Sequence, residues 1–377
     1  MRILYWIDLY SPHVGGVEVF SAKLIPALQK LGHEVAIVTS HRQFQLADKS
    51  LDNNIPVYRF NFWEALEKRN LKQSITICKQ IAQLKQDFQP DLVHLHFGAT
   101  SYFHLQTMKA YLSPTLTTIH AVPSASLSSP QSFLYKILQN SDWVNTVSPQ
   151  GLDKMRDYIP EITPHSSVVY YGLELPNLHP KTPCFDAPTL LCLGRLVPQK
   201  GFDVALDAFA SLLKRFPQIR LVIAGDGSEK TNLINQAKEL GIETAVDFKG
   251  LVAPEKVPAL LNEATMVLLP SRFEGLPLVA LQAAQMSRPI VATNVDGLPK
   301  LVINQQTGML IDKDNVTALS EAIAFCLENP HQAIKMGKAA RERFQEIFSM
   351  ESCVDNYDAL YRQIIQKNKI KSGSFAE

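Results

Sequence analysis

Residues 269–291 read LPSRFEGLPLVALQAAQMSRPIV, and this stretch does most to indicate the fold. The apolar run from 266 to 269 has the character of a buried strand and stops at Pro270. A short loop containing Glu274 follows, and an apolar helical pattern begins after it. Strand, loop and helix in this order are typical of a parallel α/β unit, which binds ligands at the carboxyl ends of its strands.

The loop brings the acid Glu274 and Gly275 to the start of the expected helix. Unpaired backbone N–H groups and the positive end of the helix dipole attract anions at such a start. Gln282 follows Glu274 by a little over two helical turns, so the two share a face if the helix extends back to Glu274. We expect a ligand with both phosphates and hydroxyls here, and an ordinary structural corner of the sheet is the alternative.

Composition sets broad limits on the function. The chain has 377 residues, 46% of them hydrophobic, and a formal charge of +1, which predicts a globular protein of two or three domains without nucleic acid as a partner. Its five cysteines are scattered and lack metal-ligand spacing, so reduced thiols and a cytoplasmic location are expected. We expect neither a signal peptide nor a membrane-spanning segment.

Strand candidates alternate with helical patterns along nearly the whole chain, which favours parallel sheets covered on both faces. In the first half the expected strands are 2–8, 33–39, 57–60, 92–97, 115–119, 144–147 and 167–171. In the second half they are 190–194, 220–224, 246–250, 266–269, 289–293 and 309–311.

Segment 173–189, between the two series of expected strands, is rich in proline and lacks periodicity, so we predict a linker there. We therefore predict two Rossmann-like, doubly wound α/β domains, 1–172 and 190–350, facing each other across a cleft. The last helical pattern, 351–370, has no strand after it.

In the first half, three strand ends carry candidate site residues. Gly15 and Gly16 lie in the loop 11–18 after the first strand, where paired glycines let a phosphate approach the backbone, although the loop is not a dinucleotide fingerprint. His96 and His120 each end a strand and could hydrogen-bond a sugar hydroxyl, or each could be an ordinary buried histidine.

In the second half, Arg195 directly follows Gly194 at a strand end, and Lys200 lies just before a helix. A planar guanidinium and a compact ammonium could together hold a diphosphate and stabilise it as a leaving group, unless both are ordinary solvated cations. A turn at Gly225 and Gly227 and the backbone near Val252 follow the next two strands and are expected to line a nucleotide pocket.

Four motifs occur in an order that resembles the GT-B-fold glycosyltransferases of family four: GGVE, GRLVPQKGFD, AGDG and PSRFEGLPLVALQAAQMSRPIVATNVDGLP. The resemblance covers nearly the whole chain. It implies transfer of a sugar from a nucleotide diphosphate sugar to an acceptor, with retention of anomeric configuration and without a cofactor. The second half would hold the nucleotide and the first half mainly the acceptor, with the 351–370 helix crossing back onto the first half. Cations that hold the diphosphate would balance its charge, so no metal is expected in the site.

The same resemblance suggests residue roles. Gly16 would contact the diphosphate through its backbone, and His120 would lie near the donor sugar. The remaining roles are phosphate binding by Arg195 and Lys200, hydroxyl binding by Glu274, and phosphate contact by the backbone of Gly275 and Leu276. One position departs from the family: relatives carry a glutamate for the ribose hydroxyls where this chain has Gln282. Because Gln282 loses a charge-assisted bond, we expect weaker nucleotide binding but intact chemistry.

Two other functions are compatible with the sequence. A nucleotide-sugar epimerase of the same fold would convert the donor without an acceptor, and a noncatalytic nucleotide-sugar-binding subunit would bind without turnover. A sugar phosphorylase lacks support, since no lysine context suggests a pyridoxal phosphate site.

Three acceptor classes are compatible with the sequence: a glycan, a lipid-linked molecule and a small molecule. The stretch 64–88 holds five basic residues and could lie on an anionic membrane, or it could be an ordinary sheet-covering helix, which is the simpler interpretation. These basic residues are Lys68, Arg69, Lys72, Lys79 and Lys85.

Overall fold

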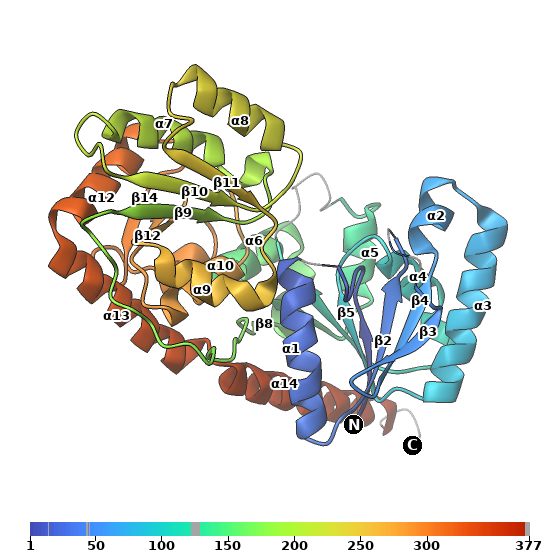
Figure 1. Cartoon of the computed structure of the whole chain (residues 1–377). Coiled ribbons are helices and arrows are strands. Elements are labelled where there is room, and N and C mark those ends of the chain that lie inside the picture. Colours follow the sequence, from blue (N-terminus) through green and yellow to red (C-terminus); the bar gives the residue numbers. More distant parts are fainter. Residues whose placement is uncertain (14, 43, 45, 122–128, 374–377) are drawn as a thin grey trace. The chain divides into compact units, whose positions relative to one another are not determined.

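A computed structural model describes residues 1–13, 15–42, 44, 46–121 and 129–373 (Figure 1). Val14, within the expected phosphate loop, lies outside the described residues. The chain forms two α/β units: Met1–Gly172 together with Met350–Glu377, and Leu173–Ser349.

The first unit is built on an eight-stranded sheet with the order β3-β4-β2-β1-β5-β6-β7-β8. Its neighbouring strands pair in parallel except β3 and β4, which are antiparallel. The strands are β1 Arg2–Trp6, β2 Glu34–Ser40, β3 Lys49–Asp52, β4 Ile55–Phe60, β5 Leu92–His96, β6 Thr115–Ile119, β7 Trp143–Thr146 and β8 Ser166–Val168. The helices are α1 Gly16–Lys30, α2 Phe62–Glu67, α3 Leu71–Phe88, α4 Ser101–Gln106, α5 Phe133–Gln139, α6 Pro149–Tyr158 and α14 Met350–Gly373.

The β3–β4 hairpin is an element that the sequence prediction missed. Asn53 and Asn54 connect the two strands with φ of 48° and 66°. Positive φ at both central residues is the signature of a type I′ turn, and asparagine tolerates that conformation. The Asn-Asn pair was therefore the available signal for an antiparallel edge strand.

The final helix, α14, belongs to the first unit and contacts its sheet from the far end of the sequence. Tyr361 Oη lies 2.7 Å from Nδ1 of His94, a buried residue of β5. Asn145 on β7 donates to Tyr357 Oη at 3.4 Å. Both tyrosine rings are fully buried, so α14 is part of the core of this unit.

The second unit has a six-stranded, all-parallel sheet with the order β11-β10-β9-β12-β13-β14. Its strands are β9 Thr189–Leu193, β10 Arg220–Ala224, β11 Val246–Gly250, β12 Met266–Leu269, β13 Ile290–Thr293 and β14 Met309–Ile311. The helices are α7 Phe202–Leu212, α8 Lys230–Glu239, α9 Val257–Glu263, α10 Leu278–Gln285, α11 Leu298–Leu301, α12 Val316–Glu328 and α13 Pro330–Ile347.

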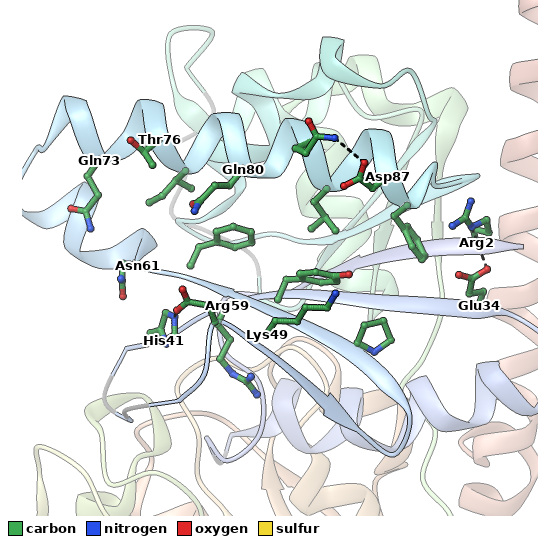
Figure 2. A pocket seen from close by; sticks show the side chains of 18 residues that line it. Arg2, Glu34, His41, Lys49, Arg59, Asn61, Gln73, Thr76, Gln80 and Asp87 are labelled. Atoms are coloured by element: carbon green, nitrogen blue, oxygen red, sulfur yellow. Dashed lines mark hydrogen bonds and ion pairs between the residues drawn. The ribbon is translucent and has the colours of Figure 1, made fainter.

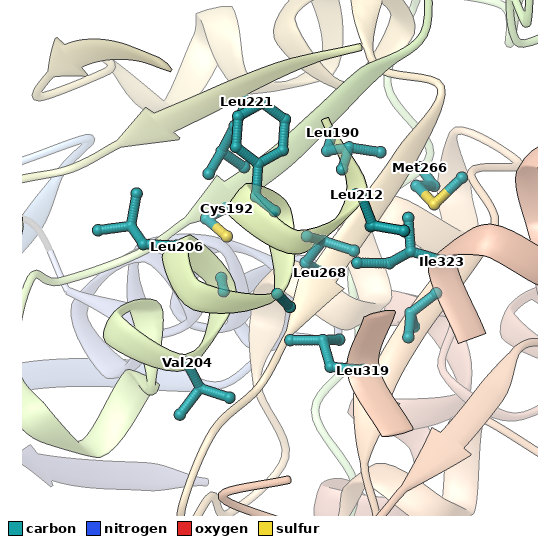
Figure 3. Packing of buried hydrophobic residues seen from close by; sticks show 14 of the residues in the cluster. Leu190, Cys192, Val204, Leu206, Leu212, Leu221, Met266, Leu268, Leu319 and Ile323 are labelled. Carbon is teal, nitrogen blue, oxygen red and sulfur yellow. The ribbon is translucent and has the colours of Figure 1, made fainter. Parts of the chain in front are cut away.

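The core of the second unit lies between the central strands and two helices (Figure 3). Leu190 and Cys192 of β9 and Leu268 of β12 meet apolar side chains of α7 and α12, among them Leu206 and Ile323. Continuous apolar runs such as these are expected where a parallel strand is covered on both faces. This packing fixes the central strands, whose carboxyl ends carry the candidate site.

The proline-rich segment 173–189 is held by the second unit and is not a free linker. The Asn262 side chain accepts from the Lys181 backbone N–H at 3.1 Å and donates to the His179 carbonyl at 2.9 Å. Residues 173–188, all of them described, form no helix or named strand and belong to the second unit.

The basic stretch 64–88 forms α2 and α3, and its charge is less exposed than the sequence suggests. Lys85 is buried, with Nζ 3.1 Å from the Thr107 carbonyl oxygen, and burial lowers its pKa to about 7. Lys68 pairs with Glu64 at 2.8 Å. The buried face of α3, with Ile81 among others, makes it a sheet-covering helix.

Candidate functional site

Three loops at the carboxyl ends of β9, β10 and β12 carry most of the expected site residues of the second unit. Gly194 to Lys200 follow β9, Gly225 and Gly227 follow β10, and Ser271 to Leu276 follow β12. The strands are neighbours in the sheet, so their ends lie at one edge.

Lys200 and Glu274 form the centre of this site. Lys200 Nζ lies 2.5 Å from Glu274 Oε1, and Ser271 Oγ donates to the same oxygen at 2.8 Å. The two side chains are only 15% and 7% exposed, so the ion pair is largely shielded from water. The aliphatic part of Lys200 lies over Gly194, where a Cβ would sit 3.5 Å from Lys200 Cε. The structure thus brings together three residues that the sequence placed in one site.

The condition for a shared helical face of Glu274 and Gln282, a helix that extends back to Glu274, is not met. Helix α10 begins at Leu278, after Pro277 at its N-cap, so Glu274 lies in the preceding loop. Asp296 Oδ2 accepts the Glu274 backbone N–H at 2.8 Å. Gln282 lies on α10 and is half-buried. The shared helical face therefore does not exist, and the Glu274 loop is ordered by side-chain bonds instead.

Arg272 is the residue of this loop that sequence reasoning missed. Its guanidinium donates to both carboxylate oxygens of Asp203, at 3.0 and 2.6 Å, and to Asp314 at 2.7 Å. The hydrogen bond to Asp203 is the main cause that raises the pKa of Arg272. Its backbone N–H donates to the Gln199 carbonyl at 2.8 Å, which joins the Lys200 loop to the Glu274 loop. Arg272 thus positions the pair and is itself engaged by carboxylates.

Two glycines allow the loops to approach one another. Gly201 has φ of 64°, and a Cβ there would lie 2.0 Å from the Pro270 carbonyl oxygen. Gly225 has φ of 143°, and a Cβ would lie 1.8 Å from the Gly194 carbonyl oxygen. Any side chain at either position would separate the loops, since both conformations and both distances require glycine.

Other predicted residues of this unit lie at the same edge without joining the ion pair. Arg195 is exposed, and the described residues show no hydrogen bond or ion pair between it and Lys200 or Glu274. Gly250, at the end of β11, accepts the Gly225 N–H at 2.8 Å, and Val252 follows two residues later. Arg195 follows β9 and Val252 follows β11, so both lie at the edge of the sheet that carries the site. The role predicted for each is contact with a bound ligand.

In the first unit, Gly15 is the N-cap of α1 and Gly16 is its first residue. A Cβ on Gly15 would lie 2.3 Å from Glu18 Oε2, so the carboxylate of Glu18 lies back against Gly15. A carboxylate near the first turn of a helix satisfies the same positive end that would attract a phosphate. A ligand phosphate at Gly16 would therefore meet the charge of Glu18.

His120 belongs to a chain of hydrogen-bonded rings. Its Nε2 lies 2.6 Å from His96 Nδ1, and its Nδ1 lies 2.5 Å from Tyr171 Oη. The His96 and His120 rings stack with their centroids 4.8 Å apart, and the centroids of the Tyr5 and His96 rings lie 4.4 Å apart. Both nitrogens of His120 are therefore engaged by protein groups, which the strand-end motif alone did not reveal.

Comparisons with known proteins agree with this geometry. A family model for glycosyl transferases group 1 matches residues 178–343, and one for glycosyltransferase family 4 matches residues 14–177. The chain is a family 4 glycosyltransferase.

Individual relatives of this glycosyltransferase differ in their reactions. A glycogen synthase of Mycobacterium tuberculosis is 27% identical over 384 residues, covering 93% of this chain and 92% of the relative. Two solved structures share the GT-B fold. Sucrose-phosphate synthase of Thermosynechococcus elongatus has a TM-score of 0.84 at 22% identity, covering 97% of this chain and 99% of that one. Anabaena Alr3699/HepE, solved with UDP and glucose, has a TM-score of 0.75 at 18% identity, covering 96% and 100%.

Burial keeps His94, His96 and His120 of this glycosyltransferase uncharged at neutral pH. Burial lowers the pKa of His94 and of His120 to about 3, and it lowers that of His96 as well. His96 Nε2 is buried and has no hydrogen-bond partner among the described residues. A buried N–H without a partner is rarer than a bare lone pair, so we infer that His96 carries its proton on Nδ1 and donates to His120. His120 then donates from Nδ1 to Tyr171.

These buried histidines predict an acid-sensitive fold. A histidine with a folded pKa near 3 and an unfolded pKa near 6.5 stabilises the fold above pH 6.5, and that contribution is lost as pH falls toward 3. Each such group contributes about 2 kcal/mol to the loss of unfolding free energy between pH 7.5 and 5.0. We expect His94→Gln to reduce this difference in urea titrations, while the exposed His331→Gln leaves it unchanged. An equal pH dependence in His94→Gln and the parent would contradict the assignment.

Proposed function

We propose that this glycosyltransferase moves a hexose-type sugar from a nucleotide diphosphate sugar to a glycan, lipid-linked or small-molecule acceptor, with retention of anomeric configuration. The observation that carries the proposal is the shielded Lys200–Glu274 pair beside Gly194 at the carboxyl ends of neighbouring parallel strands. The solved relative bound to UDP and glucose supports a nucleotide-sugar donor.

Lys200 would hold the diphosphate while Glu274 holds a sugar hydroxyl. An ammonium has three N–H donors, and Glu274 takes one of those of Lys200, so two are left for phosphate oxygens. The exposed guanidinium of Arg195 would add a planar fork, and the backbone of Gly275 and Leu276 would reach the phosphate. These cations balance the diphosphate charge, so the proposal requires neither a metal nor another cofactor.

The proposed chemistry is a front-face displacement. The bond between the anomeric carbon and the β-phosphate oxygen breaks, and the acceptor oxygen bonds to the same face of that carbon. The acceptor proton passes to the departing phosphate oxygen. Lys200 and Arg195 stabilise the negative charge that grows on this leaving group, which is where fixed charges accelerate a reaction most.

His120 and Gly16 are the first-unit residues in this proposal. With one nitrogen bonded to His96 and the other to Tyr171, His120 would bind a donor hydroxyl by sharing or exchanging Tyr171. A neutral imidazole suits that role because it can bind a hydroxyl without attracting the diphosphate. Gly16 would contact the diphosphate through its backbone after Glu18 moves aside.

A two-step experiment tests this function. Thermal-shift measurements with UDP-, GDP-, ADP- and dTDP-linked sugars should identify a donor, because binding to the folded state raises the apparent melting temperature. The selected donor is then incubated with and without an acceptor panel, and the anomeric product is assigned by NMR. A changed donor sugar without an acceptor would instead indicate the epimerase. Binding with no turnover across the panel would indicate a noncatalytic subunit.

Gln282 offers a separate prediction on nucleotide affinity. Gln282→Glu should lower the Kd of the matching nucleoside diphosphate about three- to tenfold, since a carboxylate forms stronger bonds to ribose hydroxyls than an amide does. Isothermal titration calorimetry measures this change. Gln306→Glu adds the same charge at an exposed site on a different loop and should have no effect. Equal affinities for parent and Gln282→Glu would remove this residue from the ribose site.

The cytoplasmic location in our proposal rests on the thiols. All five cysteines are free, which suits a reducing compartment. Within the described residues, no helix has both the length and the apolar character that crossing a membrane requires.

A peripheral membrane contact would use the amino-terminal part of α3, where Leu71 and Ile75 are exposed beside Arg69, Lys72 and Lys79. Three basic residues at about 1 kcal/mol each give weak binding to an anionic surface. We expect partial flotation with phosphatidylserine vesicles at low salt, none at high salt, and none with phosphatidylcholine. Absence from the anionic vesicles at every salt concentration would remove the membrane contact.

A further inference from the structure

The first unit contains a groove that the reaction described above does not use. It has a volume of about 770 Å³ and runs between α3 on one side and β3 and β4 on the other (Figure 2). One end lies at Arg2 and Glu34, and the other lies at Asn61 and Gln73. β4 alone has six residues, so the groove extends for roughly 20 Å along the sheet.

The lining of this groove contains three basic side chains, Arg2, Lys49 and Arg59, and three acidic ones, Glu34, Asp48 and Asp87, so its charge is balanced. Arg2 and Glu34 form an ion pair at 3.2 Å, and His41 lies 2.9 Å from Asp48. The lining contains three more charged residues, and each has a described contact. Arg59 donates to Ser50 at 2.7 Å, Asp87 accepts from Gln83 at 2.8 Å, and Lys49 lies over the Tyr58 ring at 5.1 Å. No cluster of one sign remains for a phosphate or a polyanion.

The lining also offers neutral polar groups that no described protein group engages. Among the described residues, the Asn61 and Gln80 amides and the Tyr58 hydroxyl have no hydrogen-bond partner. Between them lie apolar surfaces from Phe60 and Ile77. A ligand that matches this lining has many uncharged hydroxyls along its edges and C–H groups on its faces. Those are the properties of a neutral oligosaccharide.

We propose that this groove binds a neutral oligosaccharide segment of the acceptor and holds it for elongation or modification. The inference rests on the proposed function, because sugar transfer to a glycan needs the chain to be held away from its reacting end. The direction of the groove supports this proposal, because one of its ends lies at the carboxyl edge of the sheet. Asn61 follows β4 at the carboxyl edge of the sheet, where His96 ends β5 and His120 follows β6.

The test measures binding without a donor, by isothermal titration calorimetry with maltoheptaose, cellohexaose and mannohexaose as probes. We expect at least one probe to bind. Gln80→Trp should fill the groove and raise the Kd of that probe at least tenfold, and Tyr58→Phe should raise it about threefold by removing one hydroxyl. Gln86→Trp is the matched control on α3, because Gln86 is exposed and does not line the groove, and it should leave the Kd unchanged.

Several results would overturn the proposal. They are failure of all three probes to bind, unchanged binding in Gln80→Trp, and equal losses in Gln80→Trp and Gln86→Trp. Tighter binding of a heparin-derived oligosaccharide than of every neutral probe would also overturn it. The proposed function can fail independently of the groove. If the protein binds a probe but transfers no sugar, the groove proposal stands and the proposed function falls. If it transfers sugar but binds no probe, the proposed function stands and the groove proposal falls.

Discussion

Replacing Lys200 with alanine should lower kcat about 100- to 1000-fold. The ammonium lies beside Gly194 and is bonded to Glu274, at the edge where the diphosphate is expected. Removing a single group that stabilises a transition-state charge typically costs this much. Steady-state kinetics with the identified donor and acceptor measure the effect, and Lys200→Arg should recover only part of it because a planar fork does not match a point charge.

The control for this change separates catalysis from folding. Lys200→Ala leaves the buried Glu274 carboxylate without its cation, which itself destabilises the unit. Melting temperatures of the variant and of the exposed Lys214→Ala therefore accompany the kinetics. Turnover within a factor of two of the parent, in a folded variant, would refute the leaving-group role of Lys200.

Glu274→Gln should reduce kcat about 100-fold with a smaller change in stability. The amide keeps the size of the side chain and can still accept a hydrogen bond from Ser271, but it removes the charge that orients the Lys200 ammonium. Donor and hydroxyl would then be held less accurately, which lowers the rate of a reaction that depends on alignment. The readouts are kcat and the donor KM, measured separately.

This second prediction also has a positional test. Asp296→Asn leaves Glu274 unchanged and weakens the bond to its backbone N–H, so it should lower kcat by a smaller factor than Glu274→Gln. The exposed Glu243→Gln should behave as the parent does. If Glu274→Gln retains full activity, the carboxylate has no part in binding the donor sugar.

Much of the fold could be predicted because buried parallel strands leave a strong local signal. The runs at 115–119, 220–224 and 266–269 coincide with β6, β10 and β12, since each is short, rich in β-branched or apolar residues and bounded by loop residues. The β3 strand could not be found in that way. Its alternate residues are exposed at the edge of the sheet, so only the Asn53-Asn54 turn marks it.

The candidate site was predictable in its residue types but not in its contacts. Glycines and charges after strands identified Lys200, Glu274 and their loops, because parallel strands end at one edge. The fork of Arg272 on Asp203 joins positions far apart in the sequence, so no local pattern could reveal it. The same holds for His120, whose partners His96 and Tyr171 come from other segments.

The groove beneath α3 was missed for a related reason. The sequence drew attention to the basic residues of this helix, one of which, Lys85, proved to be buried. The residues that line the groove, such as Gln80, are ordinary polar side chains whose meaning depends on what lies opposite them. A cavity between a helix and a sheet is a property of packing, which single-sequence periodicity does not contain.

The pairing of α14 with β5 and β7 also affects how the polypeptide is made. A nascent chain that has left the ribosome only as far as Ser349 has every residue of the second unit but lacks Tyr357 and Tyr361, which cover His94 and Asn145 in the first. Most of the first unit is translated before the second unit, yet the first unit is completed last. Until α14 is made, the first unit exposes the apolar surface that α14 covers, and chaperones recognise such surfaces. A stop codon near residue 350 would accordingly harm the amino-terminal half more than the half next to it.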